Sequence, residues 1–578
     1  MGAFKEPHGG VLKDLYLDDA AAEQAKRAAL DFKSWDLTGR QLCDLELILN
    51  GAFSPLEGFN TQDEYARILE EMRLPSGLLW PIPVTLDVDP GFAEKIGAGE
   101  TIALRDPEGV LLATLEVRDI WTPDKDREAA AVFGTGAAAD PGADPGAHPG
   151  VDALLNRSGA VYLGGRLQGV EPQHHYDFKL FRESPAELRA RFRKLGWRKV
   201  VAFHAHKPMH RAEQELTRRA ARDCEANLLI HAVLGANGPG DPDRFTRMRC
   251  YEHLLARYPE QTTALSALNL APRLAGPREA LWHGIIRKNY GCTHLIVGRD
   301  HAGPAPAPGN GAFYAPEAAQ ELFARHQEEL DITMAPAQDM AYVEDRAQYL
   351  PRDQIPSGMT ARQLSDAEIR RRLDAGLEIP EWYSFPEVVA ELEKAHPPRH
   401  RQGFAVFFTG LSGAGKSTVA NALMVELLES GARKVTLLDG DIVRKNLSSE
   451  LGFSKEHRNL NILRIGFVAT EIVKNGGIAI CAPIAPYRAT RRQVRDAVEA
   501  AGGFVEVYVS TPIEVCEARD RKGNYAKARA GLIKGFTGVD DPYEVPERAE
   551  VVIDTRDLAP ELAAHRILVK LESLGYIR

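Results

Sequence analysis

The chain has 578 residues, of which 44% are hydrophobic and 26% charged, and its formal net charge is −10 at pH 7. This length predicts about three or four domains, each large enough to bury a core. The acidic balance argues against a general nucleic-acid-binding protein, because binding to a phosphate backbone requires a basic surface. No apolar run reaches about 18 residues, so the sequence predicts no membrane span.

Cysteine use and the amino-terminal residues indicate a compartment. The six cysteines lie far apart and form no Cys-x-x-Cys pair, which is typical of a reducing environment and gives no support to a zinc knuckle or a disulfide framework. The opening "MGAFKEPHGG" has no apolar segment of the kind that directs secretion. We therefore expect a cytoplasmic protein that binds no membrane.

The first part of the chain predicts a small mixed α/β domain. Two strand-like runs are "LLWPIPVTLDV" (78–88) and "TIALRD" (101–106). Residues 134–150, "GTGAAADPGADPGAHPG", repeat Asp-Pro-Gly. This composition predicts a surface loop that builds no packed element.

The next region predicts a parallel sheet with helices on its faces. The apolar runs "KVVAFH" (199–204), "ANLLIHAVLG" (226–235) and "THLIVGRD" (293–300) alternate with helical patterns. The stretch "FHAHKPMHRAE" (203–213) begins within the first run and continues into a predicted helix. Its three histidines, lysine and glutamate could form a working site, a metal site or the remains of an altered site.

Residues 394–403, "KAHPPRHRQG", predict a short, stiff linker, because two adjacent prolines stand between charged residues. After the linker, strand-like runs alternate with helix-length segments and predict a second parallel sheet. These runs are "GFAVFFTG" (403–410), "KVTLLDGD" (434–441), "GGIAICAPI" (476–484), "FVEVYVS" (504–510) and "EVVIDT" (550–555).

The strongest motif is "GLSGAGKS" (410–417), which has the Gly-x4-Gly-Lys-Ser spacing of a P-loop between a strand and a helix. Its glycines let backbone N–H groups turn toward a phosphate, and the helix amino terminus adds positive charge. Lys416 is expected to reach the β- and γ-phosphates of ATP, and Ser417 to bind Mg²⁺. The predicted ATP and Mg²⁺ contacts are Gly410, Leu411, Ser412, Gly413, Ala414, Gly415, Lys416, Ser417 and Thr418.

Asp439 and Asp441 follow the next predicted strand, at the carboxyl edge where open α/β sheets bind ligands. Two carboxylates beside a phosphate site suit Mg²⁺ binding and activation of a hydroxyl nucleophile. Asp-Gly-Asp is also a common turn, so this pattern is weak by itself. Residues 521–538 are basic, contain glycine and lack apolar periodicity, which is typical of a lid or of a solvated loop.

With these residues in place, the carboxyl-terminal unit resembles adenylylsulfate (APS) kinase. The matching motifs are "FFTGLSGAGKST", "DGDIVR", "LGFS", "RNLNILR", "PIAPYRATR", "KGNYAKARAG" and "FTGVDDPYE", in family order. The resemblance implies Mg²⁺-dependent transfer of the γ-phosphate of ATP to the 3′-hydroxyl of APS. It implies that Asp439, Asp441 and Lys416 are catalytic, with Asp441 as general base. A family serine proposed to carry phosphate is Ala485 here, which favours direct in-line transfer.

The same resemblance implies which side chains bind APS. Arg444, Arg458 and Asn461 would hold the phosphosulfate and the ribose, and Phe453 and Phe536 would stack on the adenine. The other implied members of this site are Ile484 and three lysines of the basic segment, Lys522, Lys527 and Lys534.

The first 395 residues resemble ATP sulfurylase, which makes APS from ATP and sulfate. Matching segments include "PHGGVL", "RQLCDLELILNGAFSPLEGF" and "LAGPREALWHGIIRKNYGCTHLIVGRDHAGP". The whole chain thus resembles bifunctional PAPS synthetases. The implied α/β architecture is a PUA-like domain (1–168), a Rossmann-like nucleotidylyltransferase domain with a small appendage (169–395), a linker (396–403) and a P-loop kinase with a parallel sheet (404–578).

One stretch departs from the sulfurylase pattern "QTRNPMHRAH". The Gln, Thr, Arg and Asn of this pattern are all replaced at positions 204–207, and its second histidine is a glutamate, whereas "GRDHAG" (298–303) is intact. The resemblance places eight residues at this altered site: His204, Ala205, His206, Lys207, His210, Glu213, Arg299 and His301.

These replacements predict loss of sulfurylase activity. Glu213 would place a negative charge near the ATP phosphates, a repulsion of roughly 1 to 3 kcal/mol. Loss of the arginine removes a bidentate anion contact that histidine cannot reproduce. Alternatively, His204, His206 and His210 could bind zinc together with His301 or Glu213. Surface histidines on a relaxed former site are the simpler alternative.

We therefore expect an active APS kinase joined to a sulfurylase-like region that has lost catalysis. A fully bifunctional PAPS synthetase is one alternative. In another, the sulfurylase-like region is a scaffold or regulatory module, and we expect it to form a homo-oligomer. ATP and APS are the expected ligands, with Mg²⁺ as cofactor and no nucleic acid or membrane as partner.

Overall fold

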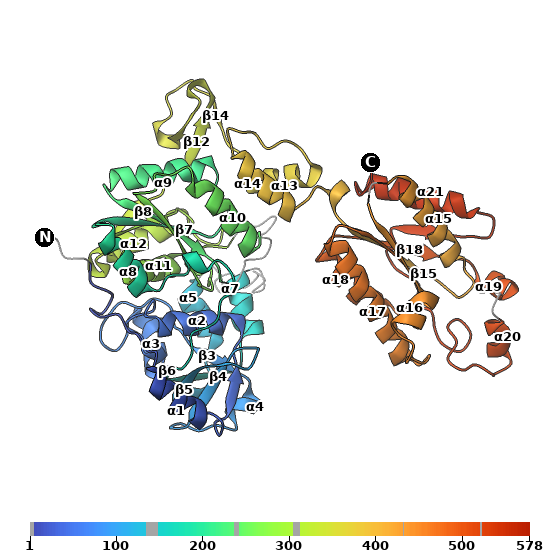
Figure 1. Cartoon of the computed structure of the whole chain (residues 1–578), viewed down its shortest axis with the longest axis horizontal. Helices are drawn as coiled ribbons and strands as arrows, with labels where there is room; N and C mark the ends of the chain where they lie inside the picture. The colour runs from blue at the N-terminus through green and yellow to red at the C-terminus, as the bar shows by residue number, and fades with distance from the viewer. Residues whose placement is uncertain (1–4, 135–147, 236–241, 305–311, 432, 521–522) are drawn as a thin grey trace. The chain divides into compact units, whose positions relative to one another are not determined.

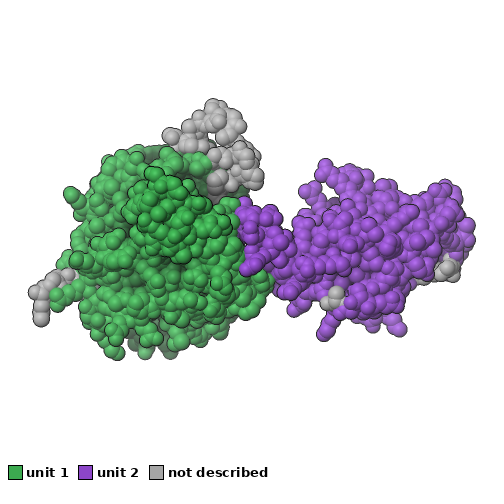
Figure 2. All heavy atoms as spheres, turned by 90° about the horizontal axis from the view of Figure 1, so that it is seen from above, with its two compact units in different colours: residues 1–365, 379–395 green, residues 366–378, 396–578 purple. Residues whose placement is uncertain are grey.

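The computed structural model describes residues 5–134, 148–235, 242–304, 312–431, 433–520 and 523–578 (Figure 1). The chain forms two compact units, which Figure 2 shows in different colours. Unit 1 comprises Met1–Ser365 and Ile379–Ala395, and unit 2 comprises Asp366–Glu378 and His396–Arg578. Unit 2 thus includes the predicted linker and the helix α13 (Asp366–Ala375). Within the described ranges, no helix combines the length and the apolar character that crossing a bilayer requires.

The amino-terminal part of unit 1 contains a mixed sheet in the order β1-β4-β5-β6-β2, with β3 also paired to β6. β1 runs parallel to β4, and the other pairs are antiparallel. The described strands are β1 (Ser34–Asp36), β2 (Gly58–Phe59), β3 (Leu86–Val88), β4 (Thr101–Arg105), β5 (Leu111–Trp121) and β6 (Val161–Gly169). The described helices are α1 (Asp19–Ala28), α2 (Gly39–Leu49), α3 (Gln62–Glu71), α4 (Pro90–Ala93), α5 (Lys125–Phe133) and α7 (Pro149–Asp152). The predicted mixed α/β fold is confirmed.

Most of the predicted Asp-Pro-Gly loop, residues 135–147, lies outside the described residues. Its end was predicted wrongly, because His148 is buried and begins a packed helix. Nδ1 of His148 accepts hydrogen bonds from the N–H groups of Gly150 and Val151, at 3.1 and 3.3 Å. Its ring also packs edge-on against Phe133. The imidazole therefore supplies both a helix cap and an apolar contact, which the Gly- and Pro-rich composition hid.

The second part of unit 1 is a parallel sheet in the order β11-β10-β7-β8-β9, as the alternation of strands and helices predicted. The strands are β7 (Val200–Ala205), β8 (Asn227–Val233), β9 (Thr263–Leu268), β10 (His294–Val297) and β11 (Thr333–Pro336). The accompanying helices are α8 (Pro185–Lys194), α9 (Arg211–Asp223), α10 (Arg244–Leu255), α11 (Pro277–Asn289) and α12 (Ala318–Leu330). Successive strands are added on one side of β7 as far as β9 and then on its other side from β10. The strand order therefore reverses between β7 and β10, which is where open α/β sheets bind ligands.

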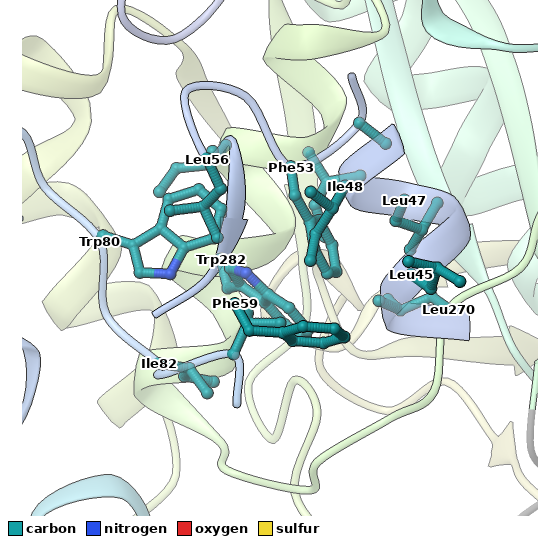
Figure 3. Packing of buried hydrophobic residues seen from close by; sticks show 14 of the residues in the cluster. Leu45, Leu47, Ile48, Phe53, Leu56, Phe59, Trp80, Ile82, Leu270 and Trp282 are labelled. Carbon is teal, nitrogen blue, oxygen red and sulfur yellow. The ribbon is translucent and has the colours of Figure 1, made fainter. Parts of the chain in front are cut away.

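The two parts of unit 1 share one hydrophobic core. Figure 3 shows Trp282 of α11 and Leu270, which follows β9, packed among residues 45–82 of the amino-terminal part. Trp282 lies with its ring centroid 4.9 Å from that of Phe53. Burial of large aromatic side chains from both parts stabilises their packing against one another. An appended hairpin region completes the unit, with β12 (Met340–Val343), β13 (Gln348–Pro351), β14 (Ala361–Arg362) and α14 (Pro386–Ala395).

Unit 2 contains a parallel sheet in the order β16-β17-β15-β18-β19, as predicted. Its strands are β15 (Phe404–Thr409), β16 (Val435–Asp439), β17 (Ile478–Ala482), β18 (Gly503–Val509) and β19 (Val551–Ile553). Its helices besides α13 are α15 (Lys416–Glu429), α16 (Gly440–Asn446), α17 (Lys455–Lys474), α18 (Arg488–Glu499), α19 (Ile513–Arg519), α20 (Asn524–Arg529) and α21 (Pro560–Ser573). β15 is central and wholly buried, which fixes the loop that follows it at the carboxyl edge of the sheet.

Candidate active site

The P-loop joins β15 to α15 in unit 2, as the motif predicted. Gly410 has φ 149°, and a Cβ added there would lie 2.5 Å from the carbonyl oxygen of Val509. Gly415 has φ 101° directly before α15. Both positions therefore require glycine, and the close turn brings the loop to the amino end of the helix.

Lys416 is turned back onto its own loop. Its buried Nζ donates hydrogen bonds to the carbonyl oxygens of Gly410 and Leu411, at 2.9 and 2.8 Å. The hydroxyl of Tyr525 in α20 donates to the carbonyl oxygen of Ser412 at 2.9 Å. The loop is thus held from inside by its lysine and from outside by the basic segment.

The paired carboxylates lie beside the P-loop. The hydroxyl of Ser417 donates a hydrogen bond to Oδ2 of Asp439 at 2.6 Å. Oδ1 of Asp439 accepts the N–H of Asp441 at 3.0 Å and so caps α16. Asp441 is exposed in the first turn of that helix. Hydroxyl and carboxylate oxygens gathered at one edge are a donor set that suits Mg²⁺.

Arg444 and Phe453, both predicted to bind APS, are neighbours. Nη1 of Arg444 donates to the carbonyl oxygens of Leu451 and Gly452, both at 3.0 Å. The guanidinium carbon lies 4.4 Å from the ring centroid of Phe453, which is 67% exposed. Arg444 therefore fixes the turn that presents this ring, and burial lowers the pKa of Arg444.

Arg458 and Asn461 lie on one face of α17, because positions three apart on a helix are neighbours. Nη1 of Arg458 donates to Oγ1 of Thr537 at 2.6 Å and pairs with Asp541 at 2.9 Å. By contrast, Nε of Arg458 and Oδ1 of Asn461 are buried without a hydrogen-bond partner among the described residues. Buried polar atoms of this kind call for a partner, such as a ligand or water.

The remaining predicted APS contacts fall in the basic segment and beside the P-loop. Phe536 is half-buried and packs edge-on against Tyr525, with ring centroids 5.0 Å apart. Lys527 and Lys534 are exposed, whereas Lys522 lies outside the described residues.

Ile484 supports the P-loop through its backbone. Its carbonyl oxygen accepts the hydroxyl of Thr409 at 2.8 Å and the N–H of Gly410 at 3.3 Å. The next residue, Ala485, is buried with φ 45°, and its carbonyl accepts Nη1 of Arg491 at 2.7 Å. These backbone contacts join the ends of β15 and β17 at the site.

Unit 1 holds a second polar cluster, made of one helix face, the end of a strand and a turn. α11 carries Glu279, His283 and Arg287, all fully buried, at i, i+4 and i+8. β7 supplies His204, and the turn after β10 supplies His301. The sulfurylase resemblance implies His204 and His301 at this site but not the three helix residues, for which their spacing was the available signal.

Direct contacts join this cluster. Nη2 of Arg287 donates to Nδ1 of His204 at 2.7 Å, and the His204 ring stacks on His283 with centroids 4.1 Å apart. Nδ1 of His283 lies 2.9 Å from Nε2 of His301. Nε2 of His283 lies 3.4 Å from Oε1 of Glu279.

The cluster holds its histidines neutral. Burial, with a contribution from the Arg287 charge, lowers the pKa of His204, His283 and His301 well below the usual histidine value. Burial also raises the pKa of Glu279 and lowers that of Arg287 to about 10. At neutral pH the three imidazoles can therefore donate and accept hydrogen bonds, but they add no positive charge.

The other residues of the altered loop differ in exposure. Ala205 is buried, whereas His206 and Lys207 are exposed. Their carbonyl oxygens accept hydrogen bonds from Arg247 at 2.6 Å and from Tyr251 at 2.7 Å. The backbone of the loop is thus anchored by α10.

His210 and Glu213 form the start of α9. The N–H of His210 donates to Oε2 of Glu213 at 2.8 Å, which is half of a capping box. Nδ1 of His210 lies 2.7 Å from Oγ of Ser384. In the turn after β10, Nε of Arg299 lies 3.3 Å from Oε1 of Glu317. Over the described ranges, no three His, Cys, Asp or Glu residues are arranged to hold a metal ion, so the zinc alternative gains no support.

Family models match three consecutive parts of the chain. They are described as PUA-like domain (residues 5–172), ATP-sulfurylase (179–395) and adenylylsulphate kinase (402–554). A sulfate adenylyltransferase from Phaeosphaeria nodorum is 50% identical over 575 residues, which cover 99% of each chain. The chain belongs to this family of fused ATP sulfurylases and APS kinases.

Two further members of the fused family bear on its function. A sulfate adenylyltransferase from Mycosarcoma maydis is 50% identical over 578 residues, with 99% of each chain covered. A solved structure described as the hexameric APS kinase from Thiobacillus denitrificans is 42% identical, with a TM-score of 0.81 and 100% of both chains covered. The expected PUA-like, sulfurylase and P-loop kinase architecture is confirmed. The relatives are named after different activities.

Proposed function

We propose that this fusion protein is an APS kinase, which transfers the γ-phosphate of ATP to the 3′-hydroxyl of adenylyl sulfate and releases PAPS and ADP. The observation that carries the proposal is the hydrogen bond between Ser417 and Asp439, which joins the P-loop to the paired carboxylates. The full-length likeness to the Thiobacillus denitrificans APS kinase supports it.

At the ATP end, Lys416 would leave the carbonyl oxygens of Gly410 and Leu411 when phosphate oxygens replace them, because charge-assisted hydrogen bonds are stronger. The P-loop N–H groups would hold the β-phosphate at the start of α15. Mg²⁺, bound by oxygens of Ser417 and Asp439, would neutralise charge between the β- and γ-phosphates.

At the acceptor end, Asp441 would take the proton of the APS 3′-hydroxyl as this oxygen bonds to the γ-phosphorus and ADP departs. Its place one residue into α16 and two after Asp439 brings a second carboxylate to the same edge of the sheet. Nε of Arg458 and Oδ1 of Asn461, which lack hydrogen-bond partners among the described residues, would supply a donor and an acceptor for the ribose and phosphosulfate.

Aromatic and basic side chains would complete the APS site. The exposed ring of Phe453 and the half-buried ring of Phe536 are suited to stack on adenine. Arg444 would keep Phe453 in place while adding positive charge. Lys527 and Lys534, exposed in the basic segment, would attract the phosphosulfate.

We further propose that the sulfurylase domain no longer makes APS. The support is that His206 stands where the family pattern has an arginine, and that burial keeps the nearby His204, His283 and His301 neutral. The names of the two fungal relatives give no support to this loss and favour a second candidate, a bifunctional enzyme that makes APS and then phosphorylates it.

The expected homo-oligomer also stays a proposal. The Thiobacillus denitrificans relative is described as hexameric, which supports self-association of this chain. We keep the sulfurylase domain as the assembling part, because the exposed large apolar side chains of that domain include Tyr176 and Leu180, at 75% and 90% exposure. A cytoplasmic location is part of the same proposal, and cell fractionation tests it.

Two assays on the purified full chain separate these functions. The kinase assay supplies ATP, Mg²⁺ and APS and measures PAPS. The sulfurylase assay measures sulfate-dependent exchange of pyrophosphate into ATP. We expect PAPS formation and no exchange above background. Exchange together with PAPS formation would establish the bifunctional candidate, and absence of PAPS would contradict the kinase proposal.

A further inference from the structure

Asp541 joins side chains from distant parts of the kinase domain. Its Oδ2 lies 2.9 Å from Nη1 of Arg458 in α17 and accepts the hydroxyl of Tyr487, just before α18, at 2.8 Å. Nη1 of Arg458 also donates to Thr537, which belongs to the same segment as Asp541. One carboxylate thus connects α17, the residue before α18 and the segment after α20.

This arrangement orients the Arg458 guanidinium. Because the group is planar and rigid, fixing Nη1 at Asp541 and Thr537 also fixes the direction of the buried Nε. Nε has no hydrogen-bond partner among the described residues, and neither has Oδ1 of Asn461 on the same helix face. Arg458 is therefore held at one end while its other end remains available to a ligand.

Burial strengthens the attraction between Arg458 and Asp541. The side chains of Arg458 and Asp541 are only 13% and 17% exposed, so water and salt screen their attraction less than at the surface. Burial, with the hydrogen bond to Asp541, raises the pKa of Tyr487 to about 12. The hydroxyl of Tyr487 therefore stays protonated throughout the neutral range and donates a hydrogen bond to Asp541.

A tight turn places Asp541. The carboxylate of Asp540 accepts the N–H groups of Gly535 and Phe536. The N–H of Gly538 donates to the carbonyl oxygen of Asp541 at 2.7 Å. The turn presents Phe536 and Asp541 from one short segment, so the proposed adenine contact and the Arg458 contact depend on the same backbone.

We propose that Asp541 is a positioning residue for APS: it holds Arg458 so that Nε meets the APS phosphosulfate or ribose, and it does so without touching ATP. This role rests on the proposed kinase function. Removal of the Asp541 charge should weaken APS binding through Arg458 and leave the ATP site intact.

The test uses the full chain with Asp541→Asn, Arg458→Gln and the double variant. We expect Asp541→Asn to raise the KM for APS about 10-fold, with the KM for ATP and kcat within about 2-fold of wild type. If Asp541 acts through Arg458, the double variant should have the APS KM of Arg458→Gln alone. Calorimetric titration with APS should show the same order of Kd values.

Two further variants serve as a control and as a substitute for Asp541→Asn. Glu547→Gln removes an exposed carboxylate that pairs with Arg488 in the same region and should change nothing. Tyr487→Phe removes one hydrogen bond from Asp541 and should raise the APS KM about 2- to 3-fold. This variant tests the same role if Asp541→Asn does not fold. Equal losses for ATP and APS, an unchanged APS Kd, or additive effects in the double variant would overturn the positioning role. Absence of PAPS from the wild type, with APS binding still weakened by Asp541→Asn, would instead overturn the kinase proposal alone.

Discussion

The carboxylate of Glu213 accepts a hydrogen bond from the backbone N–H of His210 over 2.8 Å, at the first turn of α9. Its position in the sulfurylase pattern had suggested a negative charge facing the ATP phosphates. The structure gives this carboxylate a local partner, and so its first role is to cap a helix. The proposed loss of sulfurylase activity then rests more on the replacement of the pattern's arginine by His206 than on repulsion by Glu213.

Replacing Glu213 by histidine should therefore destabilise unit 1, because it removes the carboxylate that caps α9. Loss of the cap should cost about 0.5 to 2 kcal/mol, whereas Glu213→Gln keeps a capping oxygen and should stay within about 0.5 kcal/mol of wild type. Differential scanning calorimetry of the full chain measures both. Equal stability of the two variants would show that the cap has no energetic weight.

The stability of unit 1 should fall in mild acid. The folded pKa values of His204, His283 and His301 lie well below the ordinary 6.5. Well above pH 6.5 each imidazole is neutral in both states. As the pH falls through about 6.5, the unfolded chain binds protons that the folded chain does not. Stability then decreases by up to about 1.4 kcal/mol per histidine and pH unit.

We expect the unfolding temperature of unit 1 to drop between about pH 7 and about pH 5, and His204→Gln to make this dependence shallower by about one proton. Glutamine keeps an acceptor for Arg287 and so limits other damage. Calorimetry at constant ionic strength gives the proton count. The same slope in wild type and variant would mean that His204 does not titrate on unfolding.

Kinase activity should depend on Lys416. Lys416→Ala removes the ammonium from the β/γ-phosphate position, and a loss of about 100-fold or more in kcat is expected from one charge-stabilising group. Lys474→Ala, an exposed lysine on α17, is the matched control and should retain full activity. A Lys416→Ala variant with wild-type PAPS formation would remove the P-loop from the chemistry.

Phe453 and Phe536 should set the affinity for APS more than that for ATP. Each alanine variant should raise the APS KM by the equivalent of about 0.5 to 1.5 kcal/mol of lost stacking, plus burial. The two alanine variants should differ in stability, because the Phe453 side chain is 67% exposed whereas Phe536 packs on Tyr525. Only Phe536→Ala should lower the unfolding temperature of unit 2. Unchanged APS KM values in both would exclude the rings from the site.

The full chain should form a symmetric oligomer in solution. The closed symmetry of most homo-oligomers and the hexameric relative support this expectation. Light scattering at micromolar protein measures the mass. Leu180→Asp should reduce it if the sulfurylase domain carries the contact, whereas Leu562→Asp on α21 of unit 2, at 58% exposure, should not. A monomeric wild type would refute the assembly altogether.

The position of the P-loop beside Asp439 could be predicted because both parts are local in the sequence. The P-loop is one contiguous turn, and Asp439 ends a strand whose apolar pattern is plain. The histidine cluster could not be predicted in full. Glu279, His283 and Arg287 resemble the polar face of any helix until α11 packs against the sheet and buries them with His204.

A contact near the predicted linker also escapes the sequence. The prolines near residue 397 predict a linker before the P-loop unit. Gly376 lies against residues 398–400, since a Cβ added there would be 3.2 Å from Cβ of Pro398 and 3.4 Å from Cε1 of His400. Such a contact joins segments separated by the whole of α14, and no local pattern reports it.

The chain passes between its two units three times, after Ser365, Glu378 and Ala395. A protease that cuts only near residue 396 would therefore leave thirteen residues of unit 2, Asp366–Glu378, on the other fragment. The family models follow one another along the chain, but the compact units do not, and removal of unit 2 as a whole needs more than one cut.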